Sequence, residues 1–81
     1  MQDFHNRIVN TFSVKEFGER IHELREEKGL TRLQLAKETG FTEMSIGRWE
    51  KGETVPDIQT LKTFVQFFGC TAGYLIGTEN S

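Results

Sequence analysis

Residues 31–52 read TRLQLAKETGFTEMSIGRWEKG, and this stretch decides the fold. Thr31 and Gln34 have the spacing of a capping box, in which each side chain bonds the backbone amide of the other residue. Gly40 can adopt the left-handed conformation that ends a helix and turns the chain sharply. Thr42 can then cap a new helix directly after that turn. The stretch therefore predicts two short helices joined by a very tight connection.

Two helices joined so closely must cross steeply, and the residue at their contact must be small. Ala36 occupies that position in the first helix of the pair. Ile46 and Trp49, three residues apart, predict the inward face of the second helix. The outward face of the second helix is then predicted to consist of Glu43, Met44, Gly47, Arg48 and Lys51.

The same start and stop signals recur on both sides of this pair. Ser13 and Glu16 again have capping-box spacing, and Asp57 and Thr71 can cap two further helices. Each apolar run ends at a glycine, and runs of alternating apolar and polar residues are absent, so strands are not expected. The chain is thus predicted to be all-α, with helices at 14–28, 32–39, 43–51, 58–68 and 72–76.

Apolar residues at helical spacing predict a single thin core, because a chain of 81 residues buries a limited share of its surface. Ile58 is expected to share the buried face of the helix at 58–68. The residues predicted to form the core are Phe17, Ile21, Leu24, Leu35, Ala36, Ile46, Trp49, Leu61, Phe64, Val65, Phe68 and Leu75.

Composition places the chain among soluble globular proteins, with 36% hydrophobic and 27% charged residues. No apolar run approaches the length that spans a bilayer, and the first residues lack the pattern of a secretory signal, so a cytoplasmic location without membrane contact is expected. Cys70 is the only cysteine, which excludes an internal disulfide and predicts a small buried apolar residue.

The sequence does not predict an enzyme. With one cysteine and two histidines the chain has no zinc constellation, and no residues have a recognisable catalytic arrangement. We therefore expect no metal, no cofactor and no catalytic residues. The formal net charge of −2 argues mildly against nucleic-acid binding, but the placement of the charges matters more than their sum.

The chain divides into an N-terminal arm at 1–12, a domain at 13–77 with its central motif at 31–51, and a tail at 78–81. Phe4, Ile8 and Phe12 are spaced four apart. That spacing suits either an arm ordered against the core or a frayed extension, and the sequence leaves both open.

A string of positions from 17 to 77 identifies a family. It comprises an Arg-Ile…Leu-Arg…Lys-Gly pattern between Gly18 and Gly29, then Leu35-Ala36, Gly40, Ser45-Ile46, Trp49-Glu50-Lys51-Gly52, Pro56, Leu61, and Gly69…Tyr74-Leu75-Ile76-Gly77. In this order and spacing they resemble the phage-repressor (Cro/repressor-type) helix-turn-helix family. The resemblance implies a five-helix lambda-repressor-like fold that binds double-stranded DNA as a homodimer, with its third helix in the major groove.

The resemblance also implies roles for single residues. Base-reading positions fall on Thr42, Glu43, Met44, Ser45 and Arg48, and phosphate-binding positions fall on Arg32, Gln34 and Lys51. Arg25 and Glu50 are expected to form a structural ion pair. The residue chemistry agrees, since arginine pairs with guanine, a methionine can touch a thymine methyl group and glutamate accepts from cytosine. Without the surrounding motif, Arg48 and Lys51 would be ordinary solvated side chains and Met44 a filler of the core.

The charges depart from a strongly DNA-binding pattern. Residues 31–52 hold four basic and three acidic side chains, and the loop at 53–57 has no Lys or Arg. The helix at 14–28 has five glutamates, and we expect its acidic surface to face away from DNA. Affinity per monomer should therefore be modest, so that dimerisation or a partner is needed. Phe67 is the predicted dimer contact, unless it packs under the N-terminal arm.

Two functions of different classes follow. The first is a sequence-specific transcription regulator, expected to be a repressor. The alternative is a protein-interaction module on the same fold, such as an antitoxin or a regulator that binds another protein, which the acidic helix would suit.

Overall fold

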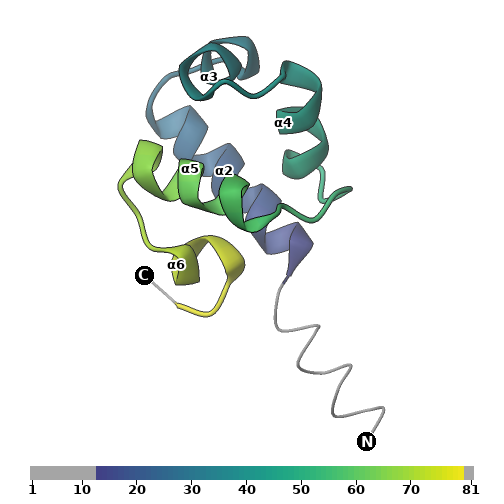
Figure 1. The fold of residues 1–81 in the computed structure, drawn as a ribbon, viewed down its shortest axis with the longest axis vertical. Coiled ribbons are helices and arrows are strands. Elements are labelled where there is room, and N and C mark those ends of the chain that lie inside the picture. Colours follow the sequence, from purple (N-terminus) through teal and green to yellow (C-terminus); the bar gives the residue numbers. More distant parts are fainter. Residues whose placement is uncertain (1–12, 80–81) are drawn as a thin grey trace, which may run out of the picture.

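The computed structural model describes residues 13–79, and in that range the regular secondary structure is all α-helix (Figure 1). Its helices are α2 (Val14–Glu27), α3 (Arg32–Thr39), α4 (Glu43–Glu50), α5 (Ile58–Phe68) and α6 (Ala72–Ile76). The predicted all-α class is confirmed, and each predicted helix agrees with the observed one to within one residue at either end. The predicted arm at 1–12 and the last two residues of the predicted tail lie outside the described residues.

Local capping explains where the helices begin. The Thr31 and Gln34 side chains form the full reciprocal box at the start of α3, and Asp57 accepts from the Thr60 amide at 2.8 Å. Ser13 accepts from the Glu16 amide at 2.9 Å, but the return bond predicted for Glu16 is absent. The Glu16 carboxylate is instead bound to Arg20 Nη2 at 3.1 Å, one turn further along α2.

The core lies between α2 and the remaining helices, and Phe64 of α5 is at its centre. The Phe64 ring lies 6.1 Å from Phe17, 5.1 Å from Phe41 and 5.6 Å from Trp49. Every residue predicted for the core is either fully buried or packed against the buried cluster. Cys70, predicted to be a small buried apolar residue, is partly buried and packs against the same cluster. The predicted core list omitted four other residues that also pack there: Leu30, Phe41, Phe67 and Tyr74.

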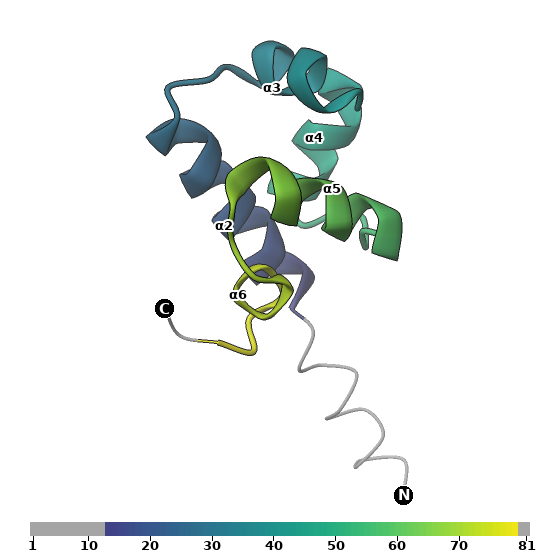
Figure 2. The ribbon, with the colours of Figure 1, turned by 60° about the vertical axis from the view of Figure 1, so that its left-hand side comes forward.

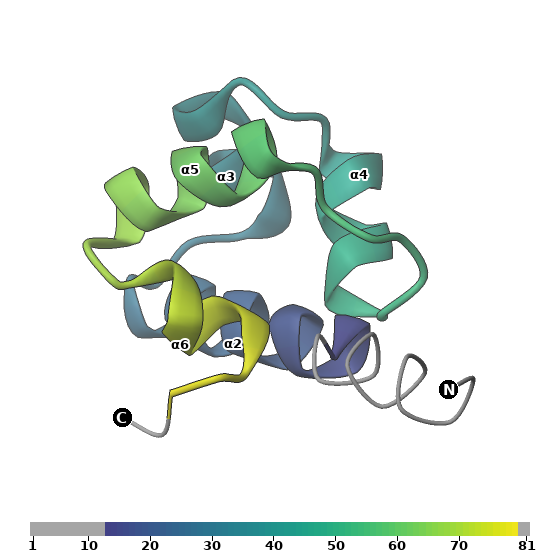
Figure 3. The ribbon, with the colours of Figure 1, turned by 60° about the horizontal axis from the view of Figure 1, so that its bottom comes forward.

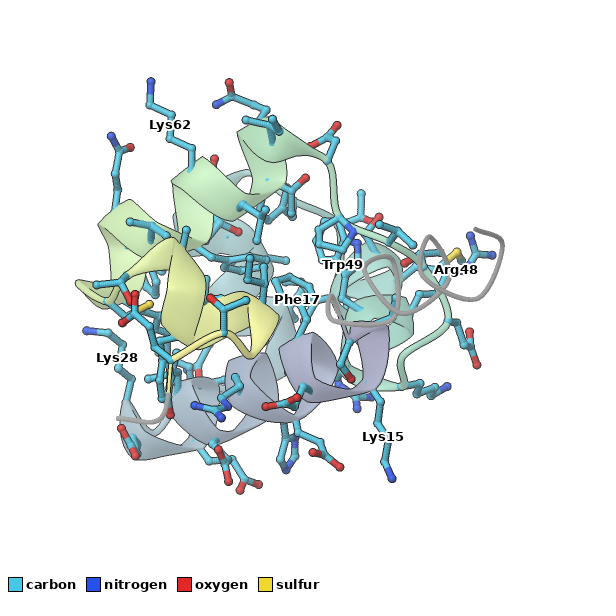
Figure 4. All side chains as sticks on the ribbon, turned by 90° about the horizontal axis from the view of Figure 1, so that it is seen from below. Lys15, Phe17, Lys28, Arg48, Trp49 and Lys62 are labelled. Carbon is cyan, nitrogen blue, oxygen red and sulfur yellow. The ribbon has the colours of Figure 1, made fainter. Side chains whose placement is uncertain are left out.

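Ile58 was predicted to be buried, and this prediction was wrong because its side chain is 82% exposed. The buried face of α5 runs through Thr60 and Phe64, whereas Ile58 lies on a neighbouring stripe. With Leu61 and Val65 of the same stripe, and with Ala72 of α6, it borders an open apolar groove. Figure 4 shows Lys62 pointing outward from the same helix.

The packing places α3 and α4 at the end of the molecule opposite α6 (Figures 1 and 2). Helix α2 packs against α4 and α6, and α5 packs against α6 and α3 (Figure 3). At Gly18, α2 approaches α4 so closely that a Cβ atom would lie 2.8 Å from the Glu50 carbonyl oxygen and overlap that of Trp49. This contact seats α4 against the core.

No helix among residues 13–79 combines the length and the apolar character needed to cross a membrane.

Candidate nucleic-acid interface

Helix α4 has a buried back and an exposed front. Ile46 is fully buried, and Trp49 packs edge-on against Phe64 and Phe41. On the opposite side Met44 is 67% exposed, and Arg48 is exposed beside it. Figure 4 shows this division, with Trp49 toward the interior and Arg48 at the periphery. The back therefore fixes the orientation of the helix, and the front is left for a partner.

The connection between α3 and α4 is as short as the sequence predicts. Gly40 has φ 84°, in the left-handed region, and α4 begins three residues later. Ala36, only 5% exposed, fills the space where a larger side chain would separate the two helices. The two helices pack directly against each other.

Gly47 was predicted on the outward face of α4, but it is buried. The cause is Arg32, which extends from the first residue of α3 across the surface of α4. A Cβ atom on Gly47 would lie 3.8 Å from Arg32 Nη1. Arg32, one of the predicted phosphate-binding residues, is therefore part of the exposed front of α4.

An open hollow of about 440 Å³ lies on the front of α4 and includes Gly47 in its lining. Arg48 and Lys51 on its rim form no ion pair with any residue in the range 13–79. Its lining brings together three cationic and two acidic side chains with one thioether and one glycine: Arg32, Glu43, Met44, Gly47, Arg48, Lys51 and Glu53. The cations can bind phosphate oxygens or guanine, and Glu43 opposes phosphate.

The smaller polar residues of the predicted site bond one another. Thr42 accepts from the Ser45 amide at 3.0 Å and its hydroxyl donates to Ser45 Oγ at 3.0 Å. Gln34 uses its side-chain oxygen on the Thr31 amide at 2.8 Å, which leaves its side-chain NH₂ group for an outside acceptor. These contacts order the starts of α3 and α4 at the same surface.

Glu50 lies at the centre of a cluster of charges behind this surface. Its side chain is 2% exposed, and Arg25 grips it with two bonds, Nε to Oε2 at 2.6 Å and Nη2 to Oε1 at 3.0 Å. Arg25 also donates to the Leu30 carbonyl at 2.8 Å. The predicted partners are thus in contact, and the bond to Leu30 extends their tie to the loop before α3.

Two further residues join the cluster, and the sequence reasoning gave neither this place. Arg32 Nε donates to Glu50 Oε1 at 2.9 Å, and His22 Nδ1 lies 3.1 Å from that oxygen and 3.1 Å from Arg25 Nη2. His22 precedes Arg25 by three residues on α2, a spacing that puts both on one helical face and could have revealed it. No local spacing signals the contact between Arg32 and Glu50.

Opposing influences act on the Glu50 carboxyl group. Burial raises its pKa, but hydrogen bonds from Arg25, His22 and Arg32 lower it more, so the pKa lies below its usual value. Glu50 is therefore held as a carboxylate. The hydrogen bonds to Glu50 raise the pKa of Arg25 in spite of its desolvation.

The acidic face of α2 was expected to lie away from the interface, and this expectation was wrong in part. Glu19 and Glu23 line a hollow together with His22, Arg32 and Glu50. Negative charge therefore borders the basic front of the motif. This arrangement supports a modest affinity for nucleic acid per monomer.

Comparison with known proteins identifies a family and relatives of this chain. A family model described as helix-turn-helix matches residues 21–75. The chain is 36% identical over 64 residues to an HTH-type transcriptional activator, BcrR, of Enterococcus faecalis, which covers 79% of this chain and 31% of that protein. It is 32% identical over 60 residues to the SPbeta prophage-derived uncharacterized HTH-type transcriptional regulator YonR of Bacillus subtilis (strain 168), which covers 74% of this chain and 56% of that protein. The matches thus span less than two thirds of both relatives.

Proposed function

The chain belongs to the helix-turn-helix family, and from that premise we propose that it regulates transcription by binding specific DNA sequences, with α4 in the major groove. A helix-turn-helix domain is a binding domain rather than an enzyme domain. The observation that carries the proposal is the front of α4, where Arg48 and Lys51 are exposed without an ionic partner among the described residues. The two relatives named as transcription regulators support it.

Residues on the exposed front of α4 are the proposed base readers. Arg48 can donate two bonds to guanine, Met44 can contact a thymine methyl group, and Glu43 can accept from the cytosine amino group. Thr42 and Ser45, at the start of the helix, complete the set. Their mutual hydrogen bonds hold them in one arrangement before DNA arrives.

Residues around this front are the proposed phosphate contacts. Lys51 follows α4, Arg32 lies across it, and Gln34 presents its free NH₂ group from the first turn of α3. Such contacts set the register of the protein on the duplex and carry no sequence information.

Selection from a random duplex library at stated salt concentrations tests the proposal. We expect recovery of one enriched motif with major-groove contacts, arranged as an inverted repeat if the protein binds as a dimer. Failure to enrich any motif would instead favour the interaction-module alternative, and binding to a partner protein could then be sought.

Single substitutions separate the two kinds of contact. Lys51→Ala should weaken binding to every duplex and reduce the salt slope by about one unit. Arg48→Ala should cost about 1–3 kcal/mol on the selected site and little on random DNA. Glu43→Gln should strengthen binding to random DNA and lose discrimination. Lys37→Ala is the matched control and should behave as wild type, because Lys37 is exposed on α3 and does not line the hollow around Gly47. Identical profiles for Arg48→Ala and Lys51→Ala would contradict the assignment.

Whether the protein represses or activates transcription is a separate part of the proposal. A domain this small can block polymerase simply by occupying a promoter, and we propose repression on that ground. The similar BcrR is named an activator. A reporter with the selected site overlapping the promoter distinguishes the two, because repression lowers its output and activation raises it.

We also propose that the protein binds DNA as a homodimer, since two recognition helices about 34 Å apart can enter successive turns of the major groove. Phe67 was the contact predicted from the sequence. It is half-buried, with its ring 5.1 Å from that of Phe68 and Lys28 Nζ 5.3 Å above it. The groove bordered by Ile58, Leu61 and Val65 offers more exposed apolar surface.

Sedimentation of three proteins assigns the dimer surface. If the groove is the interface, Ile58→Ser should dissociate the dimer while Phe67→Ser leaves it intact, and the reverse pattern would assign Phe67. A wild-type protein that remains monomeric at high concentration and on DNA would refute the dimer altogether.

A further inference from the structure

Arg32 spans two helices of the motif. Its backbone is the first residue of α3, and its guanidinium bonds Glu50, the last residue of α4, 18 positions later in the chain. Between these points the side chain passes Gly47, where a Cβ atom would lie 3.8 Å from Arg32 Nη1, an ordinary van der Waals contact. Arg32 is thus laid along the front of α4 rather than extended into solvent.

The bond to Glu50 uses one of five donors. Only Nε–H of Arg32 donates to the carboxylate, at 2.9 Å. Within the range 13–79 the two terminal nitrogens have no hydrogen-bond partner, which leaves four N–H groups of the guanidinium available. They border the hollow that also contains Arg48 and Lys51. The Arg32 side chain is 36% exposed, so an anion can reach these groups.

The Glu50 side chain is itself buried and held by Arg25. Arg25 of α2 donates a hydrogen bond to each of the two Glu50 oxygens, and only 2% of the Glu50 side-chain surface is exposed. A side chain bonded to such an anchor loses rotamer freedom before binding, and the cost of ordering it is then not incurred when DNA binds.

We propose that Glu50 is a positioning residue for DNA binding, which holds Arg32 by Nε so that its terminal nitrogens face a backbone phosphate beside α4. This rests on the proposed function. It adds that Arg32 acts by geometry as well as by charge, and that a buried carboxylate promotes the binding of a polyanion.

Arg32→Lys tests the geometry while the charge is kept. A lysine has one nitrogen, and it cannot bond Glu50 and still present a separate fork to phosphate. On a short random-sequence duplex we expect Arg32→Lys to bind about tenfold more weakly than wild type, as Arg32→Ala does, because a charge-assisted bond is lost. Both should reduce the salt slope by about one unit.

The matched control is Arg20→Lys. Arg20 is likewise bonded to a glutamate, Glu16 Oε2 at 3.1 Å, and stacks 4.2 Å from the Tyr74 ring centroid, but it lines none of the hollow around Gly47. Arg20→Lys should bind DNA within about twofold of wild type, because Arg20 lies outside the proposed DNA-binding surface. If Arg32→Lys also binds within about twofold, charge alone suffices and the positioning role is wrong.

Glu50→Gln supplies a second test, because the effect of its charge and the effect of lost positioning on DNA binding have opposite signs. Removing a carboxylate near DNA should by itself strengthen phosphate binding. Loss of positioning predicts weaker binding instead, and it predicts this only while Arg32 is present. We therefore expect Glu50→Gln to weaken binding in the wild-type background and not in Arg32→Ala. Thermal unfolding shows whether Glu50→Gln folds. If it does not fold, the binding of Arg32→Lys decides whether the positioning role is correct.

Lys51→Ala separates this inference from the proposed function. If Lys51→Ala weakens duplex binding and the Arg32 variants do not, the positioning role is overturned and the DNA-binding function stands. If wild type binds no duplex, both fall together.

Discussion

The contact of α2 with α4 at Gly18 provides the sharpest test of the packing. In Gly18→Ala the new methyl group would overlap the Trp49 carbonyl oxygen and lie 2.8 Å from that of Glu50. Both obstacles are backbone atoms of α4, which cannot rotate aside as a side chain can. Helix α4, whose front is the proposed DNA-binding surface, must therefore shift.

The magnitude follows from two opposing effects. Replacing glycine by alanine inside a helix normally stabilises by roughly 0.5–1 kcal/mol. Overpacking a well-packed contact costs about 1–3 kcal/mol, and rigid obstacles put this site at the upper end. The net loss should be about 2 kcal/mol. For a domain of this size each kcal/mol lowers Tm by roughly 4–8 °C, so Tm should fall by about 8–16 °C.

Gly47→Ala is the matched control. Gly47, like Gly18, is a glycine inside a helix without positive φ, and the nearest atom to its new methyl group is Arg32 Nη1 at an ordinary 3.8 Å. Only the helical gain applies there, so its Tm should rise by about 4 °C. Both are measured by thermal unfolding followed by circular dichroism. A Gly18→Ala protein as stable as wild type would refute the close approach of the two helices.

Three other expectations concern stability. Ala36→Leu should cost about 1–3 kcal/mol by overpacking the crossing of α3 and α4, and an unchanged Tm would count against that placement. Arg25→Ala and Glu50→Ala should show a coupling of about 0.5–3 kcal/mol in a double-mutant cycle measured by chemical denaturation. Each single variant should lose more unfolding free energy than the double variant, because it leaves the partner buried and unpaired. A coupling of zero would show that the pair does not stabilise the fold. The pKa of Glu50 is lowered in the folded state, so its contribution is complete above the unfolded pKa and is lost as the pH falls through the folded value. The stability difference between wild type and Glu50→Gln should accordingly shrink below about pH 5, and a difference independent of pH would show that the ionised form is not favoured by folding.

Much of the fold could be predicted from the sequence because helix ends are decided within a single turn. Thr31 with Gln34, and Asp57 with the Thr60 amide, are contacts three residues apart that exist in any helix beginning there. The same holds for the inward face of α4, since Ile46 and Trp49 share a side of any helix.

The errors came from contacts that depend on how helices cross. Periodicity puts Ile58 near the apolar stripe of α5, but the crossing with the neighbouring helices covers the side of Thr60 and Phe64 instead. Gly47 is on the outward side of α4 by its position, yet Arg32 covers it from another helix. Helical phase predicts which side of a helix is apolar, not what lies against it.

The sequence by itself thus determined the five capped helices among residues 13–79, the tight connection between α3 and α4, and the family to which the chain belongs. The pairing of Arg25 with Glu50 was predicted from the family resemblance, but the tertiary structure alone decided that His22 and Arg32 join the same carboxylate. The physical reason is range. Capping and amphipathic patterns are local and repeat every few residues, whereas a bond across 18 or 25 residues exists only after α2, α3 and α4 have packed.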